Sequence, residues 1–257
     1  MPDALFRLRD AGVRYGANRA LQAVSLTVSR GELVGIIGPS GSGKSSLLGL
    51  LNARRVADAG TVEVLGRSLG GIDGRELRAV RREVAWIPQD LGLVPNLRVI
   101  QNVACGRAGK RRLGSFVRSL LFTSMTEAER IHALLEHLGI SEKLYERASS
   151  LSGGEAQRVA IARALYQEPL AILADEPVSA VDPERARSLL KLLVQSAREE
   201  GLTLVASLHH VELAREFFPR LVGLREGRVM FDKAGAEVSK EEMRQLYALG
   251  GERDESR

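Results

Sequence analysis

The hydrophobic and polar positions of the chain divide it into a strand-rich start, a helical middle and an alternating end. At the start, short alternating or continuous apolar runs predict strands. The run that ends before Gly38 has the pattern of a buried parallel strand, and the residues after it predict a helix over 45–51. The predicted strands cover residues 5–8, 23–28, 32–37, 61–64 and 84–87.

The strand pattern stops after Pro88, and a mainly helical insertion is predicted as far as about residue 150. Thr126 stands three residues before Glu129, which is the pattern of a capping box, and Gly139 would end the helix that follows. The sequence therefore predicts a helix over residues 126–138.

The last part of the chain returns to alternating strands and helices. Residues 183–198 carry apolar side chains on one helical face, which predicts an amphipathic helix. The charged tail, residues 250–257, has little apolar surface to bury and is predicted to be disordered. The predicted strands here are 171–174, 202–208 and a closing hairpin formed by 221–224 and 228–231.

Composition narrows the class of protein. A length of 257 residues suits one α/β domain with a smaller annex. The single cysteine, Cys105, excludes an internal disulfide and a cysteine-based zinc site, and is expected to be a reduced thiol. Neither a signal peptide nor a membrane-spanning run is expected. The net charge of +5 would suit nucleic acid, anionic lipid or a charged small ligand, although an aromatic content of 4% argues against a base-stacking platform.

One glycine-rich segment predicts a nucleotide phosphate site. Residues 38–45 fit the pattern G-x-x-x-x-G-K-[ST] between a predicted strand and a predicted helix. Glycines let backbone N–H groups turn towards the phosphates, Lys44 would reach the outer phosphates, and Ser45 offers a hydroxyl to Mg²⁺. The alternative is a glycine-rich turn that binds nothing. The candidate binding residues are Gly38, Pro39, Ser40, Gly41, Ser42, Gly43, Lys44, Ser45 and Ser46.

Two carboxylates follow the apolar strand at 171–174. Asp175 fits a role in holding Mg²⁺, and Glu176 fits the general base that deprotonates the attacking water. The alternative is an acidic turn before Pro177. The phosphate motif elsewhere in the chain favours the catalytic interpretation.

A second glycine-capped helix start identifies the family. The segment Leu-Ser-Gly-Gly-Glu at 151–155 precedes a predicted helix over 156–165, with a Ser cap that makes another anion-binding helix end. This segment resembles the signature motif of ABC ATPases. The resemblance implies that Ser152, Gly153 and Gly154 of one subunit close over the ATP held by the other subunit, with Ser152 and Gly154 at the γ-phosphate.

Four further positions match the same family in order along the chain. Tyr15 is similar to the residue that stacks on adenine, although a core strand tyrosine is the alternative. Gln89 resembles the Q-loop glutamine that reaches Mg²⁺ and the attacking water, or else is a surface glutamine. Residues 179–182, ending in Asp182, resemble the D-loop of the dimer interface. His209, rather than its neighbour His210, resembles the switch histidine at the γ-phosphate.

The resemblance covers about residues 5–247 and implies an architecture. We expect a P-loop NTPase, RecA-like α/β core with an antiparallel β edge and a helical subdomain, in a single ABC ATPase domain. The core would comprise residues 1–87 and 160–232, the helical subdomain 88–159, and a C-terminal helix and tail 233–257. A homodimer would bind two ATP and two Mg²⁺. Two small departures are Glu155, where many members carry Gln, and Ser46, where Thr is common.

Four further segments, less specific than the core motifs, resemble the phosphonate importer ATPases. They lie at residues 174–178, 207–214, 106–122 and 222–228, whereas residues 89–93 depart from the usual pattern. The stretch 106–122 also holds a basic cluster, for which a solvated loop is favoured over contact with the membrane partner or anionic lipid. This cluster consists of Arg107, Lys110, Arg111, Arg112 and Arg118.

The resemblance implies partner proteins for this chain, and it leaves alternative functions open. Transmembrane permease subunits would bind this chain, an external binding protein would deliver the cargo, and the chain would lie at the cytoplasmic face of the inner membrane. The core motifs fit equally well an ATPase for phosphate import, amino-acid import or lipoprotein release. An ABC ATPase acting on nucleic acid is disfavoured, because the sequence has no long coiled coil, paired cassette or cysteine-rich zinc module.

Overall fold

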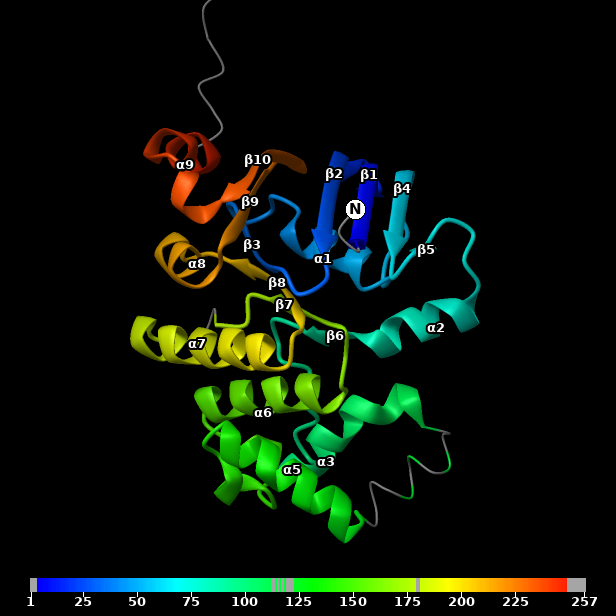
Figure 1. Cartoon of the computed structure of the whole chain (residues 1–257), viewed down its shortest axis with the longest axis vertical. Helices are drawn as coiled ribbons and strands as arrows, with labels where there is room; N and C mark the ends of the chain where they lie inside the picture. The colour runs from blue at the N-terminus through cyan, green and yellow to red at the C-terminus, as the bar shows by residue number, and fades with distance from the viewer. Residues whose placement is uncertain are drawn as a thin grey trace, which may run out of the picture.

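The computed structural model describes residues 4–111, 114, 116, 118, 123–178 and 181–248. Two β-sheets and a set of stacked helices form successive layers, with α5 at the end farthest from the four-stranded sheet (Figure 1). This arrangement confirms the predicted α/β class with an antiparallel edge and helical part. Outside the described residues lie the tail 250–257, Ser179, Ala180, Arg112 and residues 119–122.

The strands form one antiparallel sheet and one largely parallel sheet. The first has the order β2-β1-β4-β5, and the second has the order β10-β9-β3-β8-β7-β6, in which β10 runs antiparallel to β9. The strands are β1 (Ala4–Tyr15), β2 (Asn18–Ser29), β3 (Leu33–Ile37), β4 (Ala59–Val64), β5 (Arg67–Ser68), β6 (Val84–Ile87), β7 (Ala171–Asp175), β8 (Thr203–Leu208), β9 (Arg220–Arg225) and β10 (Arg228–Ala234).

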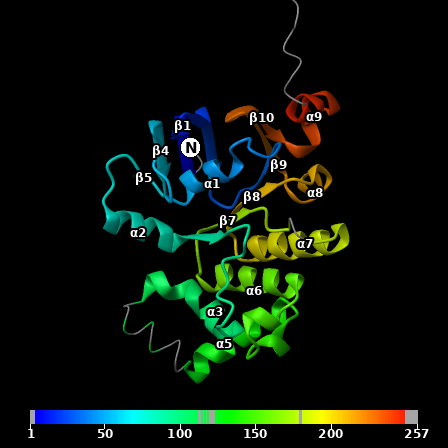
Figure 2. The same ribbon diagram turned by 180° about the vertical axis from the view of Figure 1, so that it is seen from behind.

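The helices pack around and below the larger sheet. Figure 2 shows from behind that α6 lies between α7 on one side and α3 and α5 on the other. The α-helices are α1 (Lys44–Leu51), α2 (Gly74–Glu83), α3 (Val99–Ala104), α5 (Met125–His137), α6 (Gly153–Tyr166), α7 (Pro183–Glu199), α8 (Val211–Phe217) and α9 (Lys240–Tyr247). The 3₁₀ helices are η1 (Cys105–Lys110), η2 (Ser141–Lys143), η3 (Ala148–Ser150) and η4 (Gly235–Glu237).

The larger sheet separates two apolar cores. Neighbouring side chains of a strand point to opposite faces, so Ile36 and Ile37 lie in different cores. The core on one face includes α1 and the four-stranded sheet, and the core on the other face includes α3, α5, α6 and α7. Helix α1 is therefore held between the two sheets, and each of its buried leucines contributes about 2 kcal/mol to folding.

The predicted cap of the helix α5 is wrong. The helix begins at Met125, and its N-cap is Ser124, whose hydroxyl accepts a hydrogen bond from the backbone N–H of Glu127. Glu127 does not cap the helix, because its side chain is buried and accepts a hydrogen bond from the hydroxyl of Tyr166 at 3.0 Å. The cap of the helix therefore lies two residues earlier than predicted, at Ser124.

The basic cluster is not simply a solvated loop. Arg107 forms an ion pair with Glu168, Lys110 Nζ lies 3.7 Å from Glu83 Oε2, and Arg111 Nη2 lies 2.8 Å from Glu127 Oε1. For Arg107 and Arg111, which are partly buried, the predicted solvated loop is wrong, because acidic groups of the neighbouring elements bind them; Lys110 is exposed, as predicted. Arg118 is exposed.

The division into core and helical subdomain stays a prediction. Helix α6 crosses the proposed boundary at residues 159–160, and one apolar core joins it to β7 and α7. Among the described residues, no helix combines the length and apolar character needed to span a bilayer.

Candidate functional site

The candidate site lies where four neighbouring parallel strands end. Strands β3, β8, β7 and β6 are adjacent in the sheet, so the segments after them meet at one edge. The glycine-rich loop follows β3, His209 follows β8, Glu176 follows β7, and Gln89 follows β6. The structure therefore brings together residues from four distant parts of the sequence.

The glycine-rich loop has a backbone that only glycine adopts easily at three positions. Gly38, Gly41 and Gly43 have φ angles of +155°, +77° and +106°. A Cβ atom on Gly43 would lie 2.5 Å from the carbonyl oxygen of Ala20, so a larger residue would also clash with β2. Gly43 stands directly before α1, which places the loop at the positive end of that helix.

Lys44 and Ser42 are the polar side chains buried in this loop. Lys44 is 4% exposed, and its Nζ atom donates hydrogen bonds to the carbonyl oxygens of Gly38 and Pro39 at 2.9 and 3.1 Å. Burial lowers the pKa of Lys44, an effect that the charges of Glu176 and Asp175 oppose. The buried hydroxyl of Ser42 has no partner among the described residues. A cation and an unsatisfied hydroxyl at a helix start fit a bound phosphate.

Asp175 joins the glycine-rich loop to the carboxyl end of β8. Its Oδ1 atom accepts hydrogen bonds from the hydroxyl of Ser45 at 3.1 Å and from that of Ser207 at 2.7 Å. The Ser45 hydroxyl and the Asp175 carboxylate supply the hard oxygen ligands that Mg²⁺ prefers, so this pair fits the metal.

Glu176 is held in an unusual backbone conformation beside three polar side chains. Its φ angle is +50°, and its backbone N–H donates to the Ser207 hydroxyl at 2.9 Å. Its carboxylate forms an ion pair with His209 and accepts a hydrogen bond from Gln89 Nε2 at 3.2 Å. The Nζ atom of Lys44 lies 4.0 Å from Glu176 Oε1. A non-glycine residue at positive φ costs free energy, and the hydrogen bond to Ser207 helps to hold Glu176 in this conformation.

A cavity of about 480 Å³ connects these residues to Tyr15. Tyr15 is 52% exposed and is therefore not the core tyrosine that the sequence left as an alternative. The cavity is lined by Tyr15, Asn18, Ala20, Ser40, Gly41, Gly43, Lys44, Ser45, Ser46, Gln89, Glu176 and His209.

The signature and D-loop residues lie outside this cavity. Ser152 is the N-cap of α6, and its backbone N–H and hydroxyl both donate to Glu155 Oε2 at 2.8 Å, which confirms the predicted helix cap. Asp182 is the N-cap of α7 and accepts a hydrogen bond from the backbone N–H of Arg185 at 3.0 Å. Among the described residues, the lining of the cavity includes neither Ser152, Gly153, Gly154 nor Asp182.

Sequence reasoning missed Ser207. Its hydroxyl is fully buried and connects the side chain of Asp175 to the backbone of Glu176. The signal was a serine within the apolar run 202–208, because a polar group in a buried strand needs a partner.

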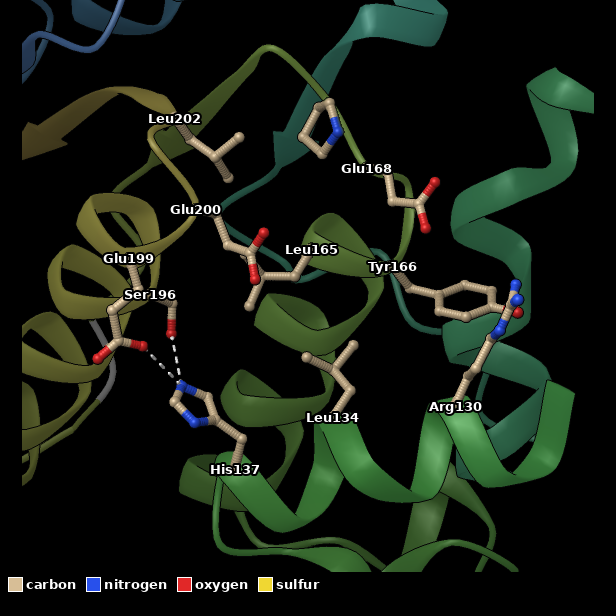
Figure 3. A pocket seen from close by; sticks show the side chains of 11 residues that line it. Arg130, Leu134, His137, Leu165, Tyr166, Glu168, Ser196, Glu199, Glu200 and Leu202 are labelled. Carbon is tan, nitrogen blue, oxygen red and sulfur yellow. Dashed lines mark hydrogen bonds and ion pairs between the residues drawn. The ribbon is translucent and has the colours of Figure 1, made fainter. Parts of the chain in front are cut away.

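A second cavity, of about 660 Å³, lies between α5, α6 and α7. Figure 3 shows His137 turned towards Ser196 and Glu199, with its Nε2 atom 3.4 Å from the serine hydroxyl and 3.6 Å from the carboxylate. None of the site residues predicted from the sequence lines this cavity, and the site chemistry is therefore placed at the strand ends.

Three curated proteins similar to this chain all carry the name phosphonates import ATP-binding protein PhnC. The chain is 42% identical over 245 residues to a phosphonates import ATP-binding protein PhnC of Rhizobium etli, covering 95% of this chain and 86% of the relative. It is 46% identical to PhnC 1 of Pseudomonas syringae pv. syringae, covering 89% and 86%. A PhnC of Anaeromyxobacter dehalogenans is 45% identical over 96% of this chain, but the chain spans only about half, 49%, of that relative's length.

Solved structures and a family model agree with these relatives. The dimeric structure of MJ0796, a bacterial ABC transporter cassette, is 30% identical with a TM-score of 0.78, covering 89% of this chain and 98% of that one. A dimeric post-hydrolysis state of MJ0796 bound to ADP and Pi is 32% identical with a TM-score of 0.75 over the same shares of the two chains. The ABC transporter family model matches residues 21–179. The chain belongs to the ABC transporter family.

Proposed function

We propose that this chain is the ATP-hydrolysing subunit of an importer for phosphonates or related phosphorus oxyanions. The observation that carries the ATPase is the convergence of the glycine-rich loop, Asp175, Glu176, Gln89 and His209 at one sheet edge. The names of the PhnC relatives support phosphonate as the cargo.

In this proposal the triphosphate of ATP binds at the start of α1. The Lys44 ammonium leaves the carbonyl oxygens of Gly38 and Pro39 for the outer phosphates, and the Ser42 hydroxyl gains the partner that it lacks. Ser45 and Asp175 would hold Mg²⁺, which neutralises phosphate charge when it is bound.

Hydrolysis needs a base beside the outer phosphate, and Glu176 is placed for that role. Its carboxylate accepts a proton from the attacking water, while Gln89 and His209 orient the carboxylate and the water. The hydrogen bond from the Glu176 backbone to Ser207 keeps the strained residue in position.

The remaining motif residues are assigned to a partner subunit's site. Ser152, Gly153 and Gly154 begin α6 outside the cavity of their own chain, so we propose that they contact the ATP of a second copy, with Asp182 at the interface. The dimers of MJ0796 support this arrangement. Permease subunits and an external binding protein complete the proposed importer, with this chain at the cytoplasmic face of the inner membrane.

The cargo is tested by uptake in cells that lack this gene. We expect uptake of a labelled alkylphosphonate, and growth on it as sole phosphorus source, to be lost while growth on phosphate is normal. The wild-type gene should restore uptake, and a gene carrying Glu176→Gln should not. Normal phosphonate uptake in the deleted strain would contradict phosphonate as the cargo.

Ser207→Ala tests the positioning of the two carboxylates. We expect kcat for ATP to fall about tenfold, because Asp175 and Glu176 each lose a hydrogen bond, while KM changes little. Steady-state ATPase kinetics measure both. The control is Ser196→Ala, which removes another buried serine hydroxyl far from the nucleotide cavity. Equal losses in the two variants would indicate only a general effect on folding.

A further inference from the structure

Tyr15 has a neighbour that the sequence motifs do not include. Tyr15 ends β1 at the tight turn into β2, and its half-exposed side chain lines the nucleotide cavity. The guanidinium carbon of Arg55 lies 5.2 Å from the centroid of the Tyr15 ring. This distance is within the range of a cation–π contact, so one face of the ring is covered by a cation.

Arg55 is itself fixed in place by two groups. Its Nη2 atom donates to both carboxylate oxygens of Asp58, at 3.1 and 2.9 Å, and to the carbonyl oxygen of Arg14 at 3.0 Å. An arginine held by a carboxylate and a backbone carbonyl has lost most of its rotamer freedom before any ligand binds.

Asp58 also clamps the strand that carries Tyr15. Its carboxylate accepts a hydrogen bond from the backbone N–H of Arg14 at 2.7 Å, and its own N–H donates to Gly12 O at 2.8 Å. Both backbone groups of Arg14, the residue directly before Tyr15, are thus bound by the pair Arg55–Asp58. Tyr15 is therefore held through its ring and through its backbone.

We propose that Arg55, fixed by Asp58, is a positioning residue for the base of the bound nucleotide and acts through Tyr15. This inference rests on the proposed function, in which Tyr15 takes the adenine. The pair follows α1, the helix that begins at the phosphate loop, so one continuous segment connects the phosphate end of the site to its base end.

The physical effect is preorganisation of an aromatic surface. A half-exposed tyrosine loses side-chain entropy when a base stacks on it, and this loss weakens binding. Because Arg55 already restricts the ring from one face, the loss is smaller and the other face is left for the base. The effect concerns the base alone, and the triphosphate does not depend on it.

The test compares two ligands that share a phosphate chain. Binding of ATP and of inorganic tripolyphosphate, each with Mg²⁺, is measured by isothermal titration calorimetry for the wild type and for Arg55→Ala. We expect Arg55→Ala to weaken ATP binding about fivefold and to change tripolyphosphate binding by less than about twofold. In a Tyr15→Ala background, Arg55→Ala should cause no further loss of ATP affinity.

Arg54→Ala is the matched control. Arg54 is the adjacent arginine and lies over a different aromatic ring, that of Trp86, with its guanidinium carbon 5.5 Å from the ring centroid. We expect this variant to bind both ligands as the wild type does. Arg55→Lys keeps a cation without the planar guanidinium, and should give a smaller loss than Arg55→Ala.

Four results would overturn the inference. Equal weakening of ATP and tripolyphosphate in Arg55→Ala would indicate a general structural role, as would an undiminished effect of Arg55→Ala when Tyr15 is absent. Unchanged ATP binding in Arg55→Ala would show that the pair does not act on the base. If Tyr15→Ala leaves ATP binding unchanged, the base platform itself fails, while tripolyphosphate binding still reports separately on the phosphate site.

Discussion

Replacement of Glu176 by Gln is expected to lower ATP turnover by about 1,000-fold or more while the affinity for ATP changes little. The amide has the shape of the carboxylate but cannot accept the proton of the attacking water. It can still contact Gln89 and His209, so the site keeps its geometry. Steady-state ATPase assays measure turnover, and titration calorimetry measures binding.

The control for this variant is Glu226→Gln. Glu226 has a φ angle of +49°, close to the +50° of Glu176, and is exposed at the β9–β10 turn. The control thus tests whether a glutamine at positive φ is harmful in itself, and we expect it to hydrolyse ATP normally. Undiminished hydrolysis by Glu176→Gln would refute its role as the base.

The Glu176→Gln variant also tests the proposal that two copies of the chain enclose each ATP between them. Because ATP would persist in Glu176→Gln, two copies should associate when ATP is added, and light scattering should report the mass of a dimer. Ser152→Glu places a negative charge at the start of α6, where the proposal puts the partner's γ-phosphate, and should prevent this association. A monomer with ATP, even in the presence of the membrane subunits, would contradict the dimeric mechanism.

The conformation of the glycine-rich loop could be predicted from the sequence, because the motif requires particular residues for its backbone. Gly41 and Gly43 are needed for their positive φ angles, and Lys44 begins the helix that follows. A motif in which local geometry requires particular residues is readable without tertiary information.

That the strands carrying the site residues end side by side could be predicted only from the family resemblance. Sequence periodicity predicts that β7 and β8 exist, but not that they are neighbours in the order β3-β8-β7-β6. The ion pair of His209 with Glu176 and the bridging hydroxyl of Ser207 follow from this order. These contacts join residues more than thirty positions apart, and local patterns do not encode them.

Several local elements were missed for different reasons. Helix α2 was missed although its N-cap is an aspartate, a residue typical of helix starts: Asp73 accepts hydrogen bonds from the backbone N–H groups of Arg75 and Glu76. The helices α3 and α8 have 6 and 7 residues, too few for a clear helical period. The predicted cap at Thr126 failed because two overlapping patterns compete: Ser124 stands three residues before Glu127, as Thr126 does before Glu129, and the helix is capped by Ser124.

Lys44→Ala is expected to weaken ATP binding about 50-fold. The ammonium is a buried cation of the glycine-rich loop, 4.0 Å from Glu176 Oε1, and its removal takes a positive charge away from the place proposed for the triphosphate. Lys44→Arg separates charge from shape, because the larger guanidinium keeps the charge but does not fit between the carbonyl oxygens of Gly38 and Pro39. It should therefore also bind ATP weakly.

Calorimetric titration with ATP measures the loss, and thermal unfolding checks that each variant is folded. Lys233→Ala serves as the control, because that lysine is bound to Glu242 far from the loop and should leave the affinity unchanged. Tripolyphosphate should lose affinity in Lys44→Ala as strongly as ATP does, since in the proposed site Lys44 contacts the phosphates and Tyr15 the base. Wild-type affinity for both ligands in Lys44→Ala would exclude this loop as the phosphate site.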